Sequence, residues 1–181
     1  MAFSEDTTFL LHAGAYKTAT STIQTLMAAN RDDILQRHGI LYPRTATRRN
    51  TGSSNADSQA HHPLYHLLHD TGQGIDAAKI AEQRERLAAE IDAAGATTVV
   101  ICTELFASAS VEHKQALREM LAPAQLRVLY TVRRPDDYIE SMLNQAYKNF
   151  RAPSPAAGKV LPTLRNLRDW EQILGREALT V

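Results

Sequence analysis

The chain has 181 residues, a formal net charge of zero and 44% hydrophobic residues, which together predict one globular domain with a sizeable core. This balance of charge excludes a general attraction to nucleic acid or to an anionic membrane surface, so any anion site must be local. The single cysteine, Cys102, excludes an internal disulfide and fits a reducing compartment. Neither a signal-peptide pattern nor a membrane-span pattern is found, and we expect a cytoplasmic protein.

Short apolar runs alternate with helical patterns along the chain. Runs typical of buried parallel strands lie at Thr8–His12, Thr97–Cys102, Arg127–Val132 and Ala178–Val181. Helical spacing predicts helices at Thr20–His38, Asp76–Ala94, Val111–Leu121, Asp136–Phe150 and Leu164–Leu174. This alternation predicts one α/β domain with three α/β/α layers, a central parallel sheet and right-handed crossovers. The polar segments Arg44–Gln59 and Arg151–Val160 are predicted to be irregular loops that cover an acceptor site.

The first strand-to-helix junction has the composition of a phosphate-binding loop. Residues 10–22 read LLHAGAYKTATST, an apolar run that enters a turn of small residues with one lysine and several hydroxyls. Free N–H groups and the positive end of the following helix attract an anion, Lys17 adds a full charge, and the hydroxyls add donors. The loop lacks the Walker A pattern GxxxxGK(S/T). The alternative is a capped helix after a buried strand, with Lys17 merely solvated.

A second strand-to-helix junction lies at residues 127–141, which read RVLYTVRRPDDYIES. Pro135 suits the first turn of a helix, and Asp136 and Asp137 suit its positive end. Because the carboxyl ends of parallel strands share one edge of the sheet, we expect Arg133 and Arg134 beside the first loop.

The two junctions resemble the sulfotransferase family, which uses 3′-phosphoadenosine 5′-phosphosulfate (PAPS). In that family a K-(S/T)-(G/A)-(S/T)-(S/T) loop after the first strand holds the 5′-phosphosulfate, and a later R-x-P-x-D-x-x-x-S segment holds the 3′-phosphate. This chain has KTATS at 17–21 and RRPDDYIES at 133–141. The resemblance, to a bacterial-type member, implies a P-loop-like sulfotransferase fold from about Thr8 onward. It implies a nucleotide site made of Gly14, Lys17, Thr18, Ala19, Thr20, Ser21, Arg133 and Ser141.

Sulfuryl transfer requires a cation at the bridging oxygen and a base that takes the acceptor proton. We expect Lys17 to be the cation, and no metal is required. We expect Glu104, directly after the strand Thr97–Cys102, to be the base. In many family members this strand ends in Lys-Thr-His with a histidine base, whereas branches that act on sugars use a glutamate. The alternative is that Glu104 caps the next short helix.

Histidines offer further candidates for chemistry. His12, just before the first loop, is either packed and hydrogen-bonded or placed beneath the sulfuryl group. His61 or His62 could reach the acceptor pocket as an alternative base. His62, His66 and His69 share one face of a predicted helix, a spacing that could suit a metal. The interleaved leucines favour a histidine-rich, partly exposed helix instead, so we predict no metal site.

The sequence thus predicts a PAPS-dependent sulfotransferase that acts on a hydroxyl or amine, with a carbohydrate as one candidate, and releases adenosine 3′,5′-bisphosphate. A kinase-like phosphotransferase is the first alternative, but it requires a Walker lysine and a strand-end aspartate for Mg²⁺. A nucleotide-binding module without catalysis is the second. The chain ends directly after its last predicted strand, where the family usually continues, which predicts a shortened or C-terminally truncated member.

Overall fold

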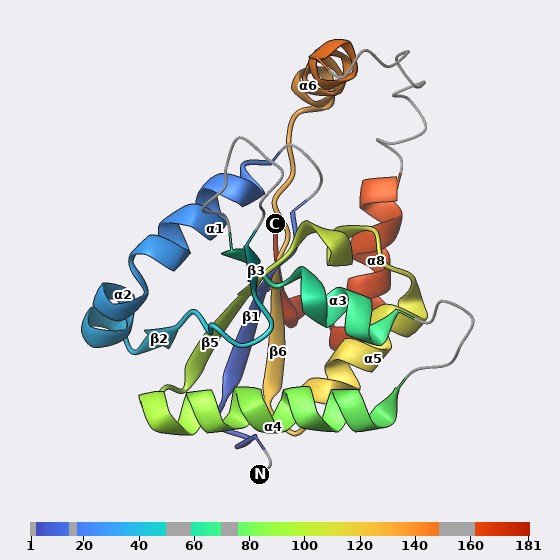
Figure 1. Ribbon diagram of the computed structural model, residues 1–181. Helices are drawn as coiled ribbons and strands as arrows, with labels where there is room; N and C mark the ends of the chain where they lie inside the picture. The colour runs from blue at the N-terminus through green and yellow to red at the C-terminus, as the bar shows by residue number, and fades with distance from the viewer. Residues whose placement is uncertain (1–2, 15–17, 50–58, 70–75, 149–161) are drawn as a thin grey trace.

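The computed structural model describes residues 3–14, 18–49, 59–69, 76–148 and 162–181. Within these ranges, five strands form one parallel sheet in the order β2-β5-β1-β6-β7, with helices on both faces (Figure 1). The strands are β1 (Thr8–His12), β2 (Ile40–Leu41), β5 (Thr98–Cys102), β6 (Gln125–Leu129) and β7 (Leu179–Thr180). The predicted three-layer α/β fold with a central parallel sheet is confirmed.

The two faces of the sheet are buried against different helices, because successive residues of a strand point to opposite sides. Phe9 and Leu11 of β1 belong to the larger core cluster. That cluster includes residues of α3 (His62–Leu68), α4 (Ala77–Ala94), α5 (Val111–Leu121) and α8 (Pro162–Leu174). On the other face, Val100 and Cys102 pack with side chains of α1 (Thr20–Ala29). His12 lies in register with Cys102.

Helix boundaries follow local capping. The predicted helix Val111–Leu121 is confirmed, and α4 begins after Asp76, whose carboxylate accepts hydrogen bonds from two N–H groups of the first turn. The single helix predicted at Thr20–His38 is wrong. It is two helices, α1 and α2 (Arg31–His38), separated at Asn30. The Leu26 carbonyl accepts from both the backbone N–H and the side-chain amide of Asn30, and such a local side-chain bond is typical of a residue at a helix end.

The strand predicted at Arg127–Val132 lies two to three residues earlier, at β6. The neighbouring strands β1 and β7 end at His12 and Thr180. Beyond Leu129, the Tyr130 N–H donates one further sheet hydrogen bond, to the Thr180 carbonyl. The next residues leave the sheet and lead into α6 (Pro135–Lys148). This early end places Thr131 and its successors above the sheet, beside the β1–α1 loop.

The predicted irregular segment Arg44–Gln59 contains an antiparallel pair, β3 (Arg48–Arg49) with β4 (Gln59–Ala60), and the two-residue β2 was not predicted either. Strands this short carry no periodic signal. Residues 50–58, and all of the loop predicted at 151–160, lie outside the described residues.

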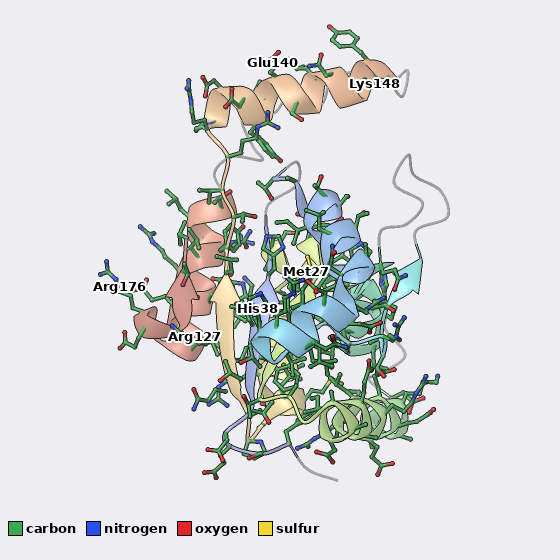
Figure 2. All side chains as sticks on the ribbon, turned by 90° about the vertical axis from the view of Figure 1, so that its left-hand side faces the viewer. Met27, His38, Arg127, Glu140, Lys148 and Arg176 are labelled. Atoms are coloured by element: carbon green, nitrogen blue, oxygen red, sulfur yellow. The ribbon has the colours of Figure 1, made fainter. Side chains whose placement is uncertain are left out.

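The helix α6 extends beyond the carboxyl ends of the strands (Figure 1). Figure 2 shows it, labelled at Glu140 and Lys148, apart from the layer of α1 and α2, labelled at Met27 and His38. No helix within the described residues is long and apolar enough to cross a membrane.

Candidate functional site

A cavity of about 770 Å³ opens beside the two junctions singled out in the sequence. Its lining consists of Thr18, Ala19, Thr20, Ser21, Thr22, Glu104, Thr131, Val132, Arg133 and Ser141. Four predicted binding residues of the first junction therefore share one cavity with the two of the second and with Glu104. This is the edge where ligands bind in open α/β sheets. Lys17 lies outside the described residues.

The first junction leaves the positive end of α1 open to the cavity. Ala19 precedes the helix, no side chain among the described residues caps its N-terminus, and its first turn contains no acidic residue. The bare N–H groups and the helix dipole favour an anion there. Ala19 has a left-handed conformation, with φ at +63°. This conformation carries a cost for any residue with a Cβ, and bulky or β-branched residues tolerate it least.

Three hydroxyls crowd around Gly14 at the end of β1. A Cβ atom on Gly14 would overlap the hydroxyl oxygens of Thr131 and Thr18 and come within 3.3 Å of that of Thr20. Thr131 donates a hydrogen bond to Thr18 over 3.0 Å, and Thr18 lies 3.5 Å from Thr20. Gly14 is therefore required because side chains from both junctions approach its backbone. The resulting cradle of donors fits the phosphate or sulfate end of a nucleotide.

Glu104 begins the short 3₁₀ helix η1 (Glu104–Ala107) and lies on the cavity wall. The residue that caps this helix is Thr103, whose hydroxyl accepts from the Leu105 N–H, so the capping role considered for Glu104 is wrong. The Glu104 carboxylate accepts a hydrogen bond from Gln24 over 3.1 Å and lies 3.5 Å from Nε2 of His62. The side chain remains 20% exposed, and so it is accessible from the cavity.

The surroundings of Glu104 hold it in its ionised form. Burial alone would raise the pKa of this carboxyl, but the hydrogen bond and charge of His62, with the hydrogen bond from Gln24, lower the pKa below its usual value. The other nitrogen of His62, Nδ1, lies 2.7 Å from the Thr103 hydroxyl. The carboxylate is thus available as a proton acceptor at neutral pH, and its orientation is fixed from two sides.

His12 and His61 are both buried and hydrogen-bonded. Nδ1 of His12 lies 3.0 Å from the Cys102 sulfur and Nε2 lies 3.3 Å from the Thr131 hydroxyl, so the packed and hydrogen-bonded state expected for His12 is confirmed. Nδ1 of His61 accepts from the Cys102 N–H, and Nε2 donates to the Pro43 carbonyl. Burial lowers the pKa of His61 to about 4. Of the two alternative bases, only His62 therefore approaches the cavity, through Glu104.

The two histidines of α3, and His69 directly after it, make three different contacts. His62 reaches Glu104, His66 packs edge-on against the Tyr65 ring, and Nδ1 of His69 lies 2.8 Å from Nε2 of His113. The histidine-rich helix is confirmed. Within the described residues, no group of three or more His, Cys, Asp or Glu side chains could hold a metal ion.

The structure distinguishes the two arginines of the second junction. Arg133 lines the cavity, whereas Arg134 forms an ion pair with Asp136 at the start of α6. A hydrogen bond from Arg134 lowers the pKa of Asp136. Ser141, in the second turn of α6, lines the same cavity as Arg133.

Two residues of the site were missed from the sequence. Thr131 is inside the second segment, two residues before Arg133, but its contact with the first loop depends on where β6 ends. Gln24 is a polar residue on the inward side of α1, and it is only 2% exposed. A polar side chain so deeply buried requires partners, but its burial is visible only in the folded chain, so the sequence carried no signal for Gln24.

No family model matches the sequence, and no curated protein sequence matches it. The chain is similar to a solved structure, the sulfotransferase domain of the olefin synthase from Synechococcus PCC 7002. The TM-score is 0.51 at 18% sequence identity, over 96% of this chain. The chain spans 64% of the length of that domain structure. At this identity the similarity is one of fold, and the fold of this protein is that of a sulfotransferase domain.

Proposed function

We propose that this protein is a PAPS-dependent sulfotransferase. It transfers a sulfuryl group to a hydroxyl or amine, with a carbohydrate as one candidate acceptor, and it releases adenosine 3′,5′-bisphosphate. The observation that supports this proposal is the single cavity lined by both junctions and by Glu104. The sulfotransferase domain that shares the fold adds support.

In this proposal the two ends of the nucleotide bind to the two junctions. The hydroxyls of Thr18, Thr20 and Ser21, and the uncapped start of α1, bind the 5′-phosphosulfate. Arg133 and Ser141 bind the 3′-phosphate. Lys17 neutralises the bridging oxygen, where negative charge develops as the sulfur–oxygen bond breaks.

Glu104 acts as the general base. It takes the proton of the acceptor hydroxyl or amine, whose heavy atom then attacks the sulfur, and the bridging oxygen leaves with the electron pair on the bisphosphate. Gln24 and His62 orient the carboxylate and keep it ionised before the acceptor binds. Orientation of this kind reduces the cost of reaching the reactive geometry.

Nucleotide binding is the first test. Adenosine 3′,5′-bisphosphate should raise the melting temperature of the protein, because a ligand at 100 times its Kd adds about 2.7 kcal/mol to the stability of the native state. ATP with Mg²⁺ is the control and should give a smaller shift. A flat titration with millimolar bisphosphate would contradict the proposal, and a larger shift with ATP would favour a phosphotransferase.

Turnover is the second test. PAPS labelled with ³⁵S, incubated with a panel of sugars, alcohols and amines, should transfer label to one acceptor class. Lys17→Ala should reduce that transfer strongly, whatever the acceptor. Bisphosphate binding without transfer to any acceptor would identify a nucleotide-binding module instead.

A further inference from the structure

The hydroxyl of Thr103 is connected to the carboxylate of Glu104 through the ring of His62. Thr103 is completely buried between the end of β5 and the start of η1. Its hydroxyl accepts from the Leu105 N–H over 3.4 Å and lies 2.7 Å from Nδ1 of His62. Nε2 of the same ring lies 3.5 Å from the Glu104 carboxylate. One imidazole therefore joins a buried hydroxyl to a carboxylate of the cavity.

The two contacts of the Thr103 hydroxyl determine the direction of its hydrogen. A threonine hydroxyl has one hydrogen to donate and two lone pairs that accept. The Leu105 N–H can only donate, so it takes one lone pair. Among the described residues, the other partner of this hydroxyl is Nδ1 of His62. The hydrogen of Thr103 therefore points to Nδ1, because a buried donor without an acceptor is costly.

The direction of this hydrogen determines the state of the His62 ring. A neutral imidazole carries one N–H, and its other nitrogen accepts. Because Nδ1 accepts from Thr103, the N–H of the neutral ring is on Nε2 and points to Glu104. Neutral His62 thus orients the carboxylate without placing a positive charge beside it.

Protonation of His62 would disturb this arrangement. The second hydrogen of an imidazolium is on Nδ1, where the hydrogen of Thr103 already points. Thr103 would have to turn its hydrogen away, and the described residues offer it no other acceptor. Burial raises the pKa of Glu104, whereas the hydrogen bond and then the charge of His62 lower it. An imidazolium at this position therefore makes the carboxylate a weaker proton acceptor.

His12 and Cys102 also interact with the charge of Glu104, but neither is charged near neutral pH. Burial is the larger effect on both, and it lowers the pKa of His12 and raises the pKa of Cys102 to about 12. The other elements near the pair contribute Gln24 of α1, His66 of α3 and Arg133 of the cavity lining. Of the described titratable groups, His62 is the one that contacts the Glu104 carboxylate.

We infer that Thr103 is a positioning residue for the proposed base, which keeps His62 neutral and directed at Glu104 and so keeps the carboxylate an active base as the pH falls. This inference rests on the proposed function, in which Glu104 takes the proton of the acceptor. It adds a second role to the cap that the same hydroxyl provides for η1. It concerns the acceptor side of the cavity and leaves the nucleotide site unchanged.

The direction of the hydrogen bond can be measured without any ligand. In ¹⁵N NMR spectra of the wild-type protein at about pH 8, where an imidazole is neutral, Nε2 of His62 should carry the hydrogen and Nδ1 should not. A hydrogen on Nδ1 would overturn the inference whatever the function of the protein, because Thr103 could not donate to that nitrogen.

The pH profile of turnover tests the catalytic part. Thr103→Val keeps the shape of the side chain and removes the hydroxyl, whereas Thr103→Ser keeps the hydroxyl. With labelled PAPS, turnover of Thr103→Val should begin to fall in acid roughly half to one pH unit above the wild type, the three- to tenfold range of one neutral hydrogen bond. Thr103→Ser should follow the wild-type profile. Both variants should bind adenosine 3′,5′-bisphosphate with wild-type affinity in calorimetric titration.

A double-mutant cycle separates the two roles of the hydroxyl. In a His62→Gln background, Thr103→Val should not shift the acid side of the profile, because the ring on which it acts is absent. Loss of the η1 cap is the same in both backgrounds. Should Thr103→Val fold poorly, Thr103→Ala removes the same hydroxyl and replaces it in the cycle, and the NMR measurement needs no variant.

The outcomes separate this inference from the proposed function. An active wild type with an unshifted Thr103→Val profile overturns the inference alone. The same holds if the shift persists in the His62→Gln background, since the effect then does not pass through the ring. A wild type that shows the expected ring state but neither binds the bisphosphate nor transfers label overturns the proposed function, and with it the catalytic role of Thr103, while the direction of the hydrogen bond is confirmed.

Discussion

The two strand-to-helix junctions of this protein both line one cavity but are held in different ways. At the β1–α1 junction, Thr18 is connected through Thr131 and His12 to the buried core. At the β6–α6 junction, Arg133 and Arg134 are both exposed, and Arg134 forms a local ion pair with Asp136.

Because of this difference, substitutions at the first junction should affect both folding and binding, whereas those at the second should affect mainly binding. Residues at the first junction occupy positions set by the core, so a substitution there changes the shape of the binding loop as well as its chemistry. At the second junction the functional groups stand on an exposed link, where a change of side chain costs little stability. The same kind of ligand group, a phosphate, is thus expected to bind a rigid cradle at one end and an exposed arginine at the other.

The largest effect is expected at Glu104, which follows β5 and lines the same cavity as the two junctions. Glu104→Gln keeps the size of the side chain and still forms hydrogen bonds, but the amide cannot take up the proton of the hydroxyl or amine that is sulfated. Turnover should fall by about 10²–10⁴-fold, the usual cost of losing a general base, while bisphosphate affinity is unchanged. Turnover with labelled PAPS and calorimetric titration measure the two quantities.

The control for this substitution is Glu85→Gln, on the exposed side of α4 and outside the cavity lining. It should leave both quantities unchanged. Normal turnover in Glu104→Gln would move the base to another group, with His62 the first candidate because it contacts the same carboxylate.

The two arginines provide a matched pair for the second junction. Arg133→Ala should weaken adenosine 3′,5′-bisphosphate about ten- to hundredfold, since a hydrogen bond to a charged group contributes roughly 1.5–3 kcal/mol. Binding of adenosine 5′-monophosphate, which lacks the 3′-phosphate, should not change. Arg134→Ala should change either affinity by less than about twofold, because that side chain pairs with Asp136 outside the cavity lining.

The melting temperature completes this comparison. Neither arginine substitution should lower it by more than a degree or two, because both side chains are exposed. Equal losses of affinity in both variants would show that the junction attracts phosphate by general charge and that the geometry at Arg133 has no special role.

Acid should destabilise the folded protein, because the buried His61 resists protonation in the folded state. Its pKa is about 4 in the folded protein, below the usual value of 6.5, so the unfolded chain binds more protons between these values. The free energy of unfolding should therefore fall as the pH drops from about 6.5 to 4, with His61 contributing up to roughly 3 kcal/mol. Above pH 6.5 this contribution to stability is fully present.

Urea unfolding at several pH values measures the slope, and NMR titration of the His61 ring identifies its source. The His61→Gln variant should show a shallower loss in acid, and His38→Gln, at the exposed end of α2, controls for the removal of one histidine. A His61 ring that titrates near its usual pKa would contradict the buried, hydrogen-bonded geometry.

The sequence predicted the parts of this structure that depend on local patterns. Buried parallel strands are continuous apolar runs, so the strand predicted at Thr8–His12 has the observed bounds of β1. Helical spacing likewise predicted α5 with its observed bounds. Both junction motifs were recognised because their residues are contiguous in the chain.

Features that depend on distant contacts could not be predicted in this way. The early end of β6 follows from where β1 and β7 stop, and that end brings Thr131 to Thr18, which is 113 positions away in sequence. The orientation of Glu104 depends on Gln24 and His62, which come from two other helices. Such a constellation has no contiguous signature, because each member is an ordinary polar residue until the chain folds.

The smallest expected effect concerns backbone strain at the first junction. Ala19 has φ at +63°, and Ala46, outside the cavity lining, has φ at +61°. A left-handed conformation costs a residue with a Cβ roughly 1–2 kcal/mol, and a glycine substitution removes this cost. Part of the resulting gain in stability is lost again, because glycine increases the entropy of the unfolded chain. Ala19→Gly and Ala46→Gly should therefore each stabilise the protein by up to about 1 kcal/mol in urea unfolding.

Valine at the same two positions separates strain from binding. Because a β-branched residue tolerates positive φ poorly, Ala19→Val and Ala46→Val should both destabilise the protein. Only Ala19→Val should also weaken adenosine 3′,5′-bisphosphate, since Ala19 sets the direction of the first N–H groups of α1 at the cavity. If Ala46→Val weakened the nucleotide equally, loss of stability alone would explain both results, and the rigid cradle assigned to the first junction would be wrong.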